Sequence, residues 1–182
     1  FSMAPNWIKT KEFQYQKLGD ERWGTPYFNF LHQLAIPNHV LIRSRFVNYL
    51  IISIPLHLAV FMIMFFFTNS NDMLPIGNFI AFSLIWFCFG IYGGLLYPAS
   101  DTGDVISNLK LTIYFIIIVV GFIGSLLLTF LLTGRGIVQW TVVAATHWPL
   151  LSSVISIFLA IVGLNVWLSY AAKNMKKIDY LK

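Results

Sequence analysis

The chain has 182 residues, of which 58% are apolar, 17% aromatic and only 10% charged. A typical soluble domain carries about 25% charged residues, so this composition excludes an ordinary water-soluble fold. The net charge of +5 comes from basic residues at the chain ends and beside the apolar runs, which argues against nucleic acid as a partner because no basic stripe forms.

Residues 1–46 are predicted to form a polar and aromatic arm outside the membrane. Proline and glycine interrupt this arm repeatedly, so loops and short helices are expected there. An apolar stretch near its end leads into Arg43 and Arg45, which favours a short interfacial helix whose arginines contact lipid phosphates. Packing of the arm on a neighbouring subunit or on the membrane helices explains the same residues equally well.

Four apolar runs are long enough to cross a membrane, since a hydrocarbon core of about 30 Å takes about 20 helical residues. The first three spans are expected at about 47–67, 76–97 and 111–133. The lone cysteine, Cys88, is expected to pack inside the second span as a small hydrophobe. The predicted fold class is all-α, a polytopic membrane protein with a four-transmembrane-helix bundle and an aromatic N-terminal interfacial arm.

The last apolar stretch, 137–172, is too long for a single untilted span. Pro149 offers a division, because the residue before a proline is pushed away from the α region. We expect a short interfacial or re-entrant piece over 137–147 and the fourth span over 149–172, followed by a basic tail, 173–182. One long, kinked and tilted helix is the alternative.

The basic residues predict the orientation in the membrane. With both termini on the inner side, eleven of the twelve lysines and arginines lie inside and only Arg135 lies outside, as the positive-inside rule requires. The inner side is then the cytoplasm or the matrix, of a bacterial or mitochondrial inner membrane. Arg135, Trp140 and Trp148 are expected at the outer interface, in contact with phospholipid or a partner subunit.

Small residues recur at helical spacing in two spans, a pattern that allows membrane helices to pack closely. They predict packing within the bundle or against another subunit. The pair in the second span and the longer face in the fourth span are Gly90, Gly94, Ser152, Ser156, Ala160 and Gly163.

Two histidines are the candidate cofactor residues. His57 lies near the middle of the first span, where an ionisable side chain is costly and often functional. Its options are a haem b ligand, a proton relay or a quinone contact, with His147 as the partner from a distant span. A bis-histidine haem requires 137–172 to be one helix, because a break at Pro149 leaves His147 at the outer interface. A hydrogen-bonded structural histidine needs no cofactor.

The sequence contains no Walker loop, dinucleotide fingerprint or His-Glu-x-x-His motif, and the expected spans hold no charged residue. We therefore expect a non-catalytic subunit, not an enzyme, with no metal site, in a hetero-oligomeric membrane complex of respiration, secretion or transport. One alternative is a small redox subunit that binds haem b or a quinone. Another is an oligomeric transporter or pore former.

Overall fold

The computed structural model describes residues 16–17, 22–24, 30–31, 34, 36–67, 74–100 and 106–179. Its helices and short antiparallel strands are α3 (Asn38–Phe67), α5 (Ile76–Gly94), α6 (Leu96–Ser100), α7 (Asn108–Thr133), α8 (Ile137–His147), α9 (Pro149–Asp179), β1 (Gln16–Lys17), β2 (Arg22–Gly24) and β3 (Ile106–Ser107). The predicted fold class is confirmed. The described part of the chain is helical apart from this small sheet, and it contains four helical segments long and apolar enough to span a membrane.

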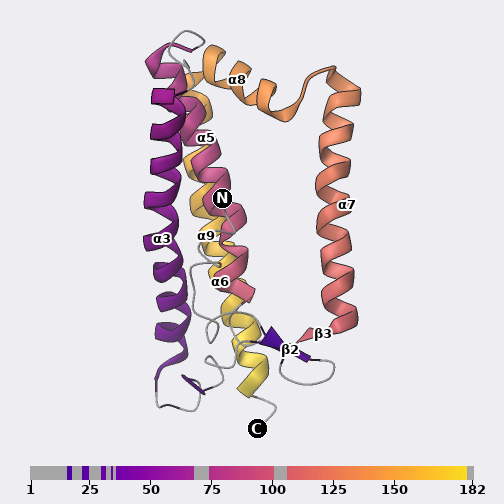
Figure 1. The fold of residues 1–182 in the computed structure, drawn as a ribbon. Coiled ribbons are helices and arrows are strands. Elements are labelled where there is room, and N and C mark those ends of the chain that lie inside the picture. The colour runs from indigo at the N-terminus through magenta and orange to yellow at the C-terminus, as the bar shows by residue number, and fades with distance from the viewer. Residues whose placement is uncertain are drawn as a thin grey trace.

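The four spans run roughly parallel to one another between two ends of the molecule (Figure 1). We call these the sheet end, where β2 and β3 lie, and the α8 end. The N-terminus of α3 and the C-terminus of α9 both lie at the sheet end (Figure 1). Most of the expected arm, 1–46, lies outside the described residues.

The first span differs from its expected limits because α3 begins at Asn38 and continues to Phe67, whereas hydropathy placed its start near Val47. Residues 38–46 are therefore the first turns of a long helix and not a separate interfacial one. Pro37 precedes the helix and its carbonyl accepts a bond of 2.9 Å from the Val40 amide. No proline or glycine follows until Pro55, which lies inside α3 without ending it.

α3, α5 and α9 pack together, and α5 and α9 share the most extensive helix contact in the described residues. Membrane helices gain little from apolar burial against lipid, so close fit decides these contacts. The core at the α8 end is Ala81, Phe82 and Ala145. The core at the sheet end is Leu41, Ile42, Phe46, Tyr49, Leu95, Ala99, Ala171 and Met175.

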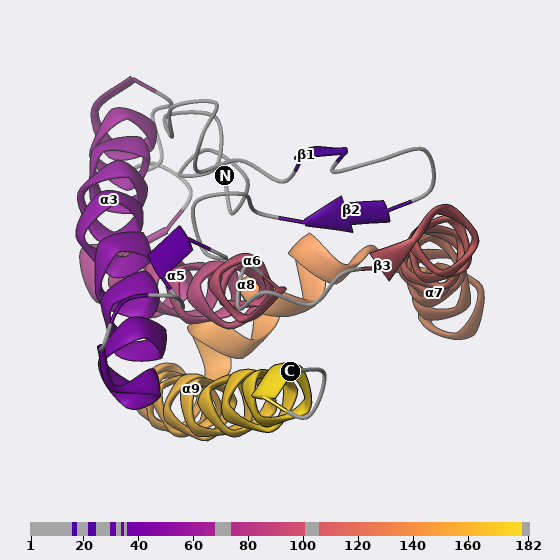
Figure 2. The same cartoon turned by 90° about the horizontal axis from the view of Figure 1, so that it is seen from below.

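α7 stands apart from the other three spans in both views (Figures 1 and 2). None of its 26 residues is buried. The N-terminal end of α7 is attached through β3, which pairs with β2. Its C-terminal end is attached through α8 (Figure 1). The four spans are thus three packed helices and a fourth held beside them by its ends.

The chain divides at Trp148, between α8 and α9. The amide of Trp148 donates to the Ala144 carbonyl at 3.0 Å, and the Trp148 carbonyl accepts from Ser152 at 2.9 Å. Pro149 has no amide hydrogen to continue α8. α8 crosses from α7 to the start of α9 at one end of the molecule (Figure 1), and α9 remains helical beyond Ala172, through the first part of the expected tail.

Candidate functional site

His57 lies against Gly90 where α3 meets α5. The histidine is buried, and its Nδ1 lies 2.7 Å from the Ser53 carbonyl oxygen and 3.2 Å from Ser53 Oγ. Because a carbonyl oxygen only accepts, Nδ1 carries a proton and donates to it. The other ring nitrogen, Nε2, faces Gly90, at which a Cβ would collide with the imidazole. The glycine therefore makes room for the histidine.

The structure does not bring His147 to His57. His147 is exposed at the last residue of α8, with its ring 6.1 Å from that of Trp148. His57 lies ten residues before the end of α3, which is about 15 Å from the α8 end. A bis-histidine haem needs its two ligands on opposite sides of one iron, and Nε2 of His57 already faces Gly90. The described residues do not fit that group.

A cavity of about 410 Å³ adjoins His57 between α3, α5 and the start of α8. Its walls are mainly aromatic and apolar, and they include Trp86, Phe89 and Met64. Trp86 is fixed in place because its Nε1 donates to Thr141 Oγ1 at 3.1 Å. The cavity can hold an apolar ring or chain, with His57 as the one ionisable side chain among its lining residues.

The small-residue face predicted in the fourth span contacts a tyrosine of α5. Tyr92 of α5 lies over Gly163 of α9, where a Cβ would fall 2.6 Å from Tyr92 Cε2. Trp167 Nε1 donates to the Tyr92 carbonyl at 3.1 Å, across the same pair of helices. Gly94, two residues after Tyr92 on α5, is buried. This α5–α9 seam combines close packing with one polar bond between helices.

The remaining small residues of the fourth span line cavities. Ser152 and Ser156 border a space of about 440 Å³ between α5, α8 and α9, together with Trp140 and Trp148. Ser156 also borders a second space with Ala160 and Gly163. The Ser156 hydroxyl donates to the Ser152 carbonyl at 2.8 Å, so it needs no partner helix as an acceptor.

The predicted interfacial residues at the α8 end form a turn between α7 and α8. Trp140 Nε1 donates to Thr133 Oγ1 at 2.9 Å, and the Arg135 guanidinium lies 6.0 Å from the centre of the Trp140 ring. Gly134 adopts a left-handed conformation with φ of 66°, which favours glycine. Trp140 and Trp148 are both exposed, so their rings are available to lipid or to a partner.

The two arginines at the start of the first span differ in position. Arg43 is exposed, as a contact to lipid phosphate requires, but Arg45 is only 8% exposed. Phe46, the next residue, belongs to the buried core at the sheet end. α3 therefore turns the Arg45 side chain inward, which favours the alternative that it packs on the membrane helices, and its contact with lipid or a partner stays a prediction.

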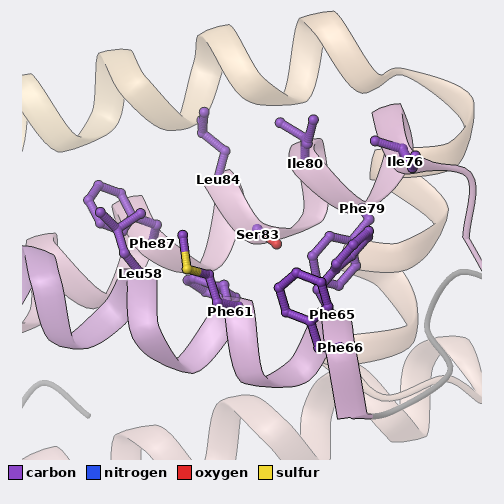
Figure 3. A pocket seen from close by; sticks show the side chains of 11 residues that line it. Leu58, Phe61, Phe65, Phe66, Ile76, Phe79, Ile80, Ser83, Leu84 and Phe87 are labelled. Carbon is purple, nitrogen blue, oxygen red and sulfur yellow. The ribbon is translucent and has the colours of Figure 1, made fainter.

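One further feature was not predicted. Between α3 and α5 lies an apolar groove of about 530 Å³, whose walls include five phenylalanines (Figure 3). Phe61 and Phe65 follow each other at helical spacing, as do Phe79 and Phe87 with Ser83 between them. That spacing was a signal for one aromatic face on each helix. It does not show that the two faces meet.

Taken together, the helices define a polytopic membrane protein, with one described side-chain bond between α5 and α8 and one between α5 and α9. No protein-family model, no curated protein and no solved structure matches this chain.

Proposed function

We propose that the protein is a non-catalytic integral subunit of a larger membrane assembly, of the kind found in respiration, secretion or transport. The observation that carries this proposal is α7, a span of 26 residues with no buried side chain. The other three spans pack on one another. A span that contributes nothing to its own chain's core is available to other subunits.

An apolar helix can also be surrounded by lipid alone, so the way α7 is attached is needed to argue for a partner subunit. Its first end is anchored by β2–β3 pairing, and its N-cap Ser107 side chain accepts from the Lys110 amide. Its last end is fixed by the bond between Trp140 and Thr133. Defined connections at both ends, together with a helix that buries no residue among the described part of the chain, favour a space kept for a partner.

The charges of the described residues suit an orientation with the sheet end inside. Lys110 lies in the first turn of α7 at this end, and the exposed side chains of Arg43 and Lys173 lie on the nearby parts of α3 and α9. Arg135 lies at the α8 end. The positive-inside rule then places the sheet end in the cytoplasm or the matrix, and places Arg135 and Trp140 among phospholipid headgroups or against another subunit.

Affinity purification from a mild detergent tests the assembly directly. The tagged wild-type chain should retain other membrane subunits in constant ratio, as identified by mass spectrometry. Gly124→Trp, which adds a large ring to the open side of α7, should lose them while the chain stays folded. Gly77→Trp is the matched control, because that position on α5 is equally open. A wild-type chain that purifies as a stable monomer without partners would overturn the proposal.

A second candidate function is a redox subunit that binds a quinone. It is favoured by the aromatic cavity of about 410 Å³ beside His57. It ranks second because Nε2 is buried against Gly90. An azido-quinone should label α3 and α5, and His57→Gln should abolish the labelling. His147→Gln is the control, since His147 does not line this cavity. Labelling that is absent or unaffected by His57→Gln counts against this function.

A further inference from the structure

The space of about 440 Å³ between α5, α8 and α9 is a groove in the surface of the protein, which we call the α8 groove. One wall is a face of α8, on which Ile137, Trp140 and Ala144 recur at helical spacing. Another wall is the start of α9, where Leu151 and Ile155 are exposed. The groove is therefore open on a side of the protein that the membrane surrounds.

The hydroxyl groups in the walls of the α8 groove are already paired. Thr141 donates to the Val138 carbonyl at 2.8 Å, within α8. Ser152 and Ser156 likewise donate to carbonyls of α9, at 3.2 and 2.8 Å. A hydrocarbon chain in the groove would leave none of these groups unsatisfied, whereas a polar occupant would bury groups of its own without partners. The walls thus suit an apolar chain.

The α8 groove has the depth of one leaflet of the membrane. With a rise of about 1.5 Å per residue, Ser156 lies about 10 Å from the first residue of α9, and Ile85 lies about 14 Å from the first residue of α5. Both helices begin at the α8 end (Figure 1). Half of a hydrocarbon core of about 30 Å is about 15 Å. The exposed rings of Trp140 and Trp148 suit the membrane interface, so the groove would run from there to roughly the midplane.

A cation lies beside the α8 groove, at the end where a headgroup would be. The Arg135 guanidinium is 6.0 Å from the centre of the Trp140 ring, and Trp140 lines the groove. Of the residues that the structure describes at the α8 end, Arg135 is the only one with a fixed charge, and it is exposed. Lipid phosphates are the opposite charge that a membrane interface supplies.

We infer that the α8 groove binds one glycerophospholipid, with an acyl chain against α8 and α9 and the phosphate at Arg135. A partner helix fits the groove less well, because a helix is about 10 Å wide and would continue across the whole membrane. The lining of the groove ends at Ser156 and Ile85, which is the reach of a single chain. This inference goes beyond the proposed function, because the site requires no other subunit.

Native mass spectrometry of the full chain in mild detergent tests the headgroup contact, with phosphatidylglycerol as the probe. The wild-type chain should retain one lipid at concentrations too low for further lipids to bind. Arg135→Gln should weaken this binding about fivefold, the effect of roughly one arginine at a lipid surface. Lys110→Gln is the matched control, because Lys110 is an exposed cation at the opposite end of α7, and it should leave the tightest site unchanged.

Cross-linking tests the position of the acyl chain. Phosphatidylglycerol with a diazirine in one chain, added at one lipid per protein chain, should label α8 and the start of α9. Ser152→Phe should lose this label, because the added ring fills the groove. Ser153→Phe is the matched control, since its hydroxyl donates to the same Pro149 carbonyl but the residue does not line the groove. If Ser152→Phe does not fold, Arg135→Gln on the surface still decides.

The inference would be overturned by lipid that binds Arg135→Gln as tightly as the wild-type chain. It would also be overturned by label that spreads evenly over the exposed side of α7, because this is the pattern of the general lipid layer. Label that persists in Ser152→Phe would mean that the chain lies elsewhere. The proposed function fails separately: a chain that retains other subunits without this lipid keeps the function, and a lone chain with the lipid keeps the site.

Discussion

The ring of Tyr92 on α5 lies over Gly163 on α9, in a space that admits no side chain. A Cβ at Gly163 would fall 2.6 Å from Tyr92 Cε2 and closer still to Cδ2. The close ring atoms extend back to Cγ, near the backbone, and the Tyr92 carbonyl accepts a hydrogen bond from Trp167, which holds this part of α5 beside α9. The position of α9 against α5 therefore depends on the absence of a side chain at one residue.

Gly163→Leu should consequently separate α5 from α9. Overpacking of a tight contact costs about 1–3 kcal/mol, and we expect a loss of that size in thermal unfolding followed by circular dichroism. Gly93→Leu is the control, because a Cβ at Gly93 has no atom within 4 Å. Equal stability of the two variants would show that the glycine contact is not needed.

His57 and Gly90 should be energetically coupled, because the imidazole fills the space beside the glycine. Gly90→Ala should destabilise the chain by about 1–3 kcal/mol. In the background of His57→Ala the same change should cost less by about 1 kcal/mol, the coupling expected for residues in contact. Chemical denaturation of the four chains of this cycle measures the difference. Strict additivity would mean that α3 and α5 do not meet at these residues.

The indole of Trp167 should contribute a measurable bond between helices. Trp167→Phe removes the donor to the Tyr92 carbonyl, and such bonds in membrane proteins contribute about 0.6 kcal/mol on average and up to about 1.7. Trp148→Phe is the matched control, because the Trp148 side chain is 60% exposed. A larger loss from Trp148→Phe than from Trp167→Phe would contradict this assignment.

Much of the fold could be predicted because bilayer thickness dictates helix length. The four spans were found from their apolar runs, and the structure confirms four such helices. The ends of the helices were harder to predict, because hydropathy marks the edge of the hydrocarbon core and not the end of a helix. α3 thus extends to Asn38 through Arg43 and Arg45, where nothing breaks the backbone.

The contacts between helices could not be predicted. In the sequence, Gly90 is a candidate packing residue and His57 is a candidate cofactor residue, and no pattern connects the two. That they meet depends on how α3 and α5 are rotated about their axes, which periodicity alone does not determine. The separation of α7 from the other spans was not predicted either, because hydropathy does not distinguish an apolar helix surrounded by lipid from one covered by apolar side chains of a protein.

The orientation predicts which ends of the spans face outward. In a Cys88→Ala background, Arg135→Cys should react with an impermeant maleimide added to intact spheroplasts or mitoplasts, because Arg135 is exposed at the α8 end. Lys110→Cys, exposed at the opposite end, should react only after permeabilisation. The reverse pattern would place the sheet end outside and would contradict the positive-inside assignment.

The turn at Gly134 should control how far α7 stands from the other spans. Its φ of 66° lies in the left-handed region, which costs an ordinary residue about 1–2 kcal/mol but which asparagine tolerates. Gly134→Val should therefore loosen the junction with α8, whereas Gly134→Asn should preserve it. Spin labels at the exposed Leu131 and Leu151, in a Cys88→Ala background, report the distance between α7 and α9. We expect a broader distribution for valine only; equal distributions would show that β3 alone positions α7.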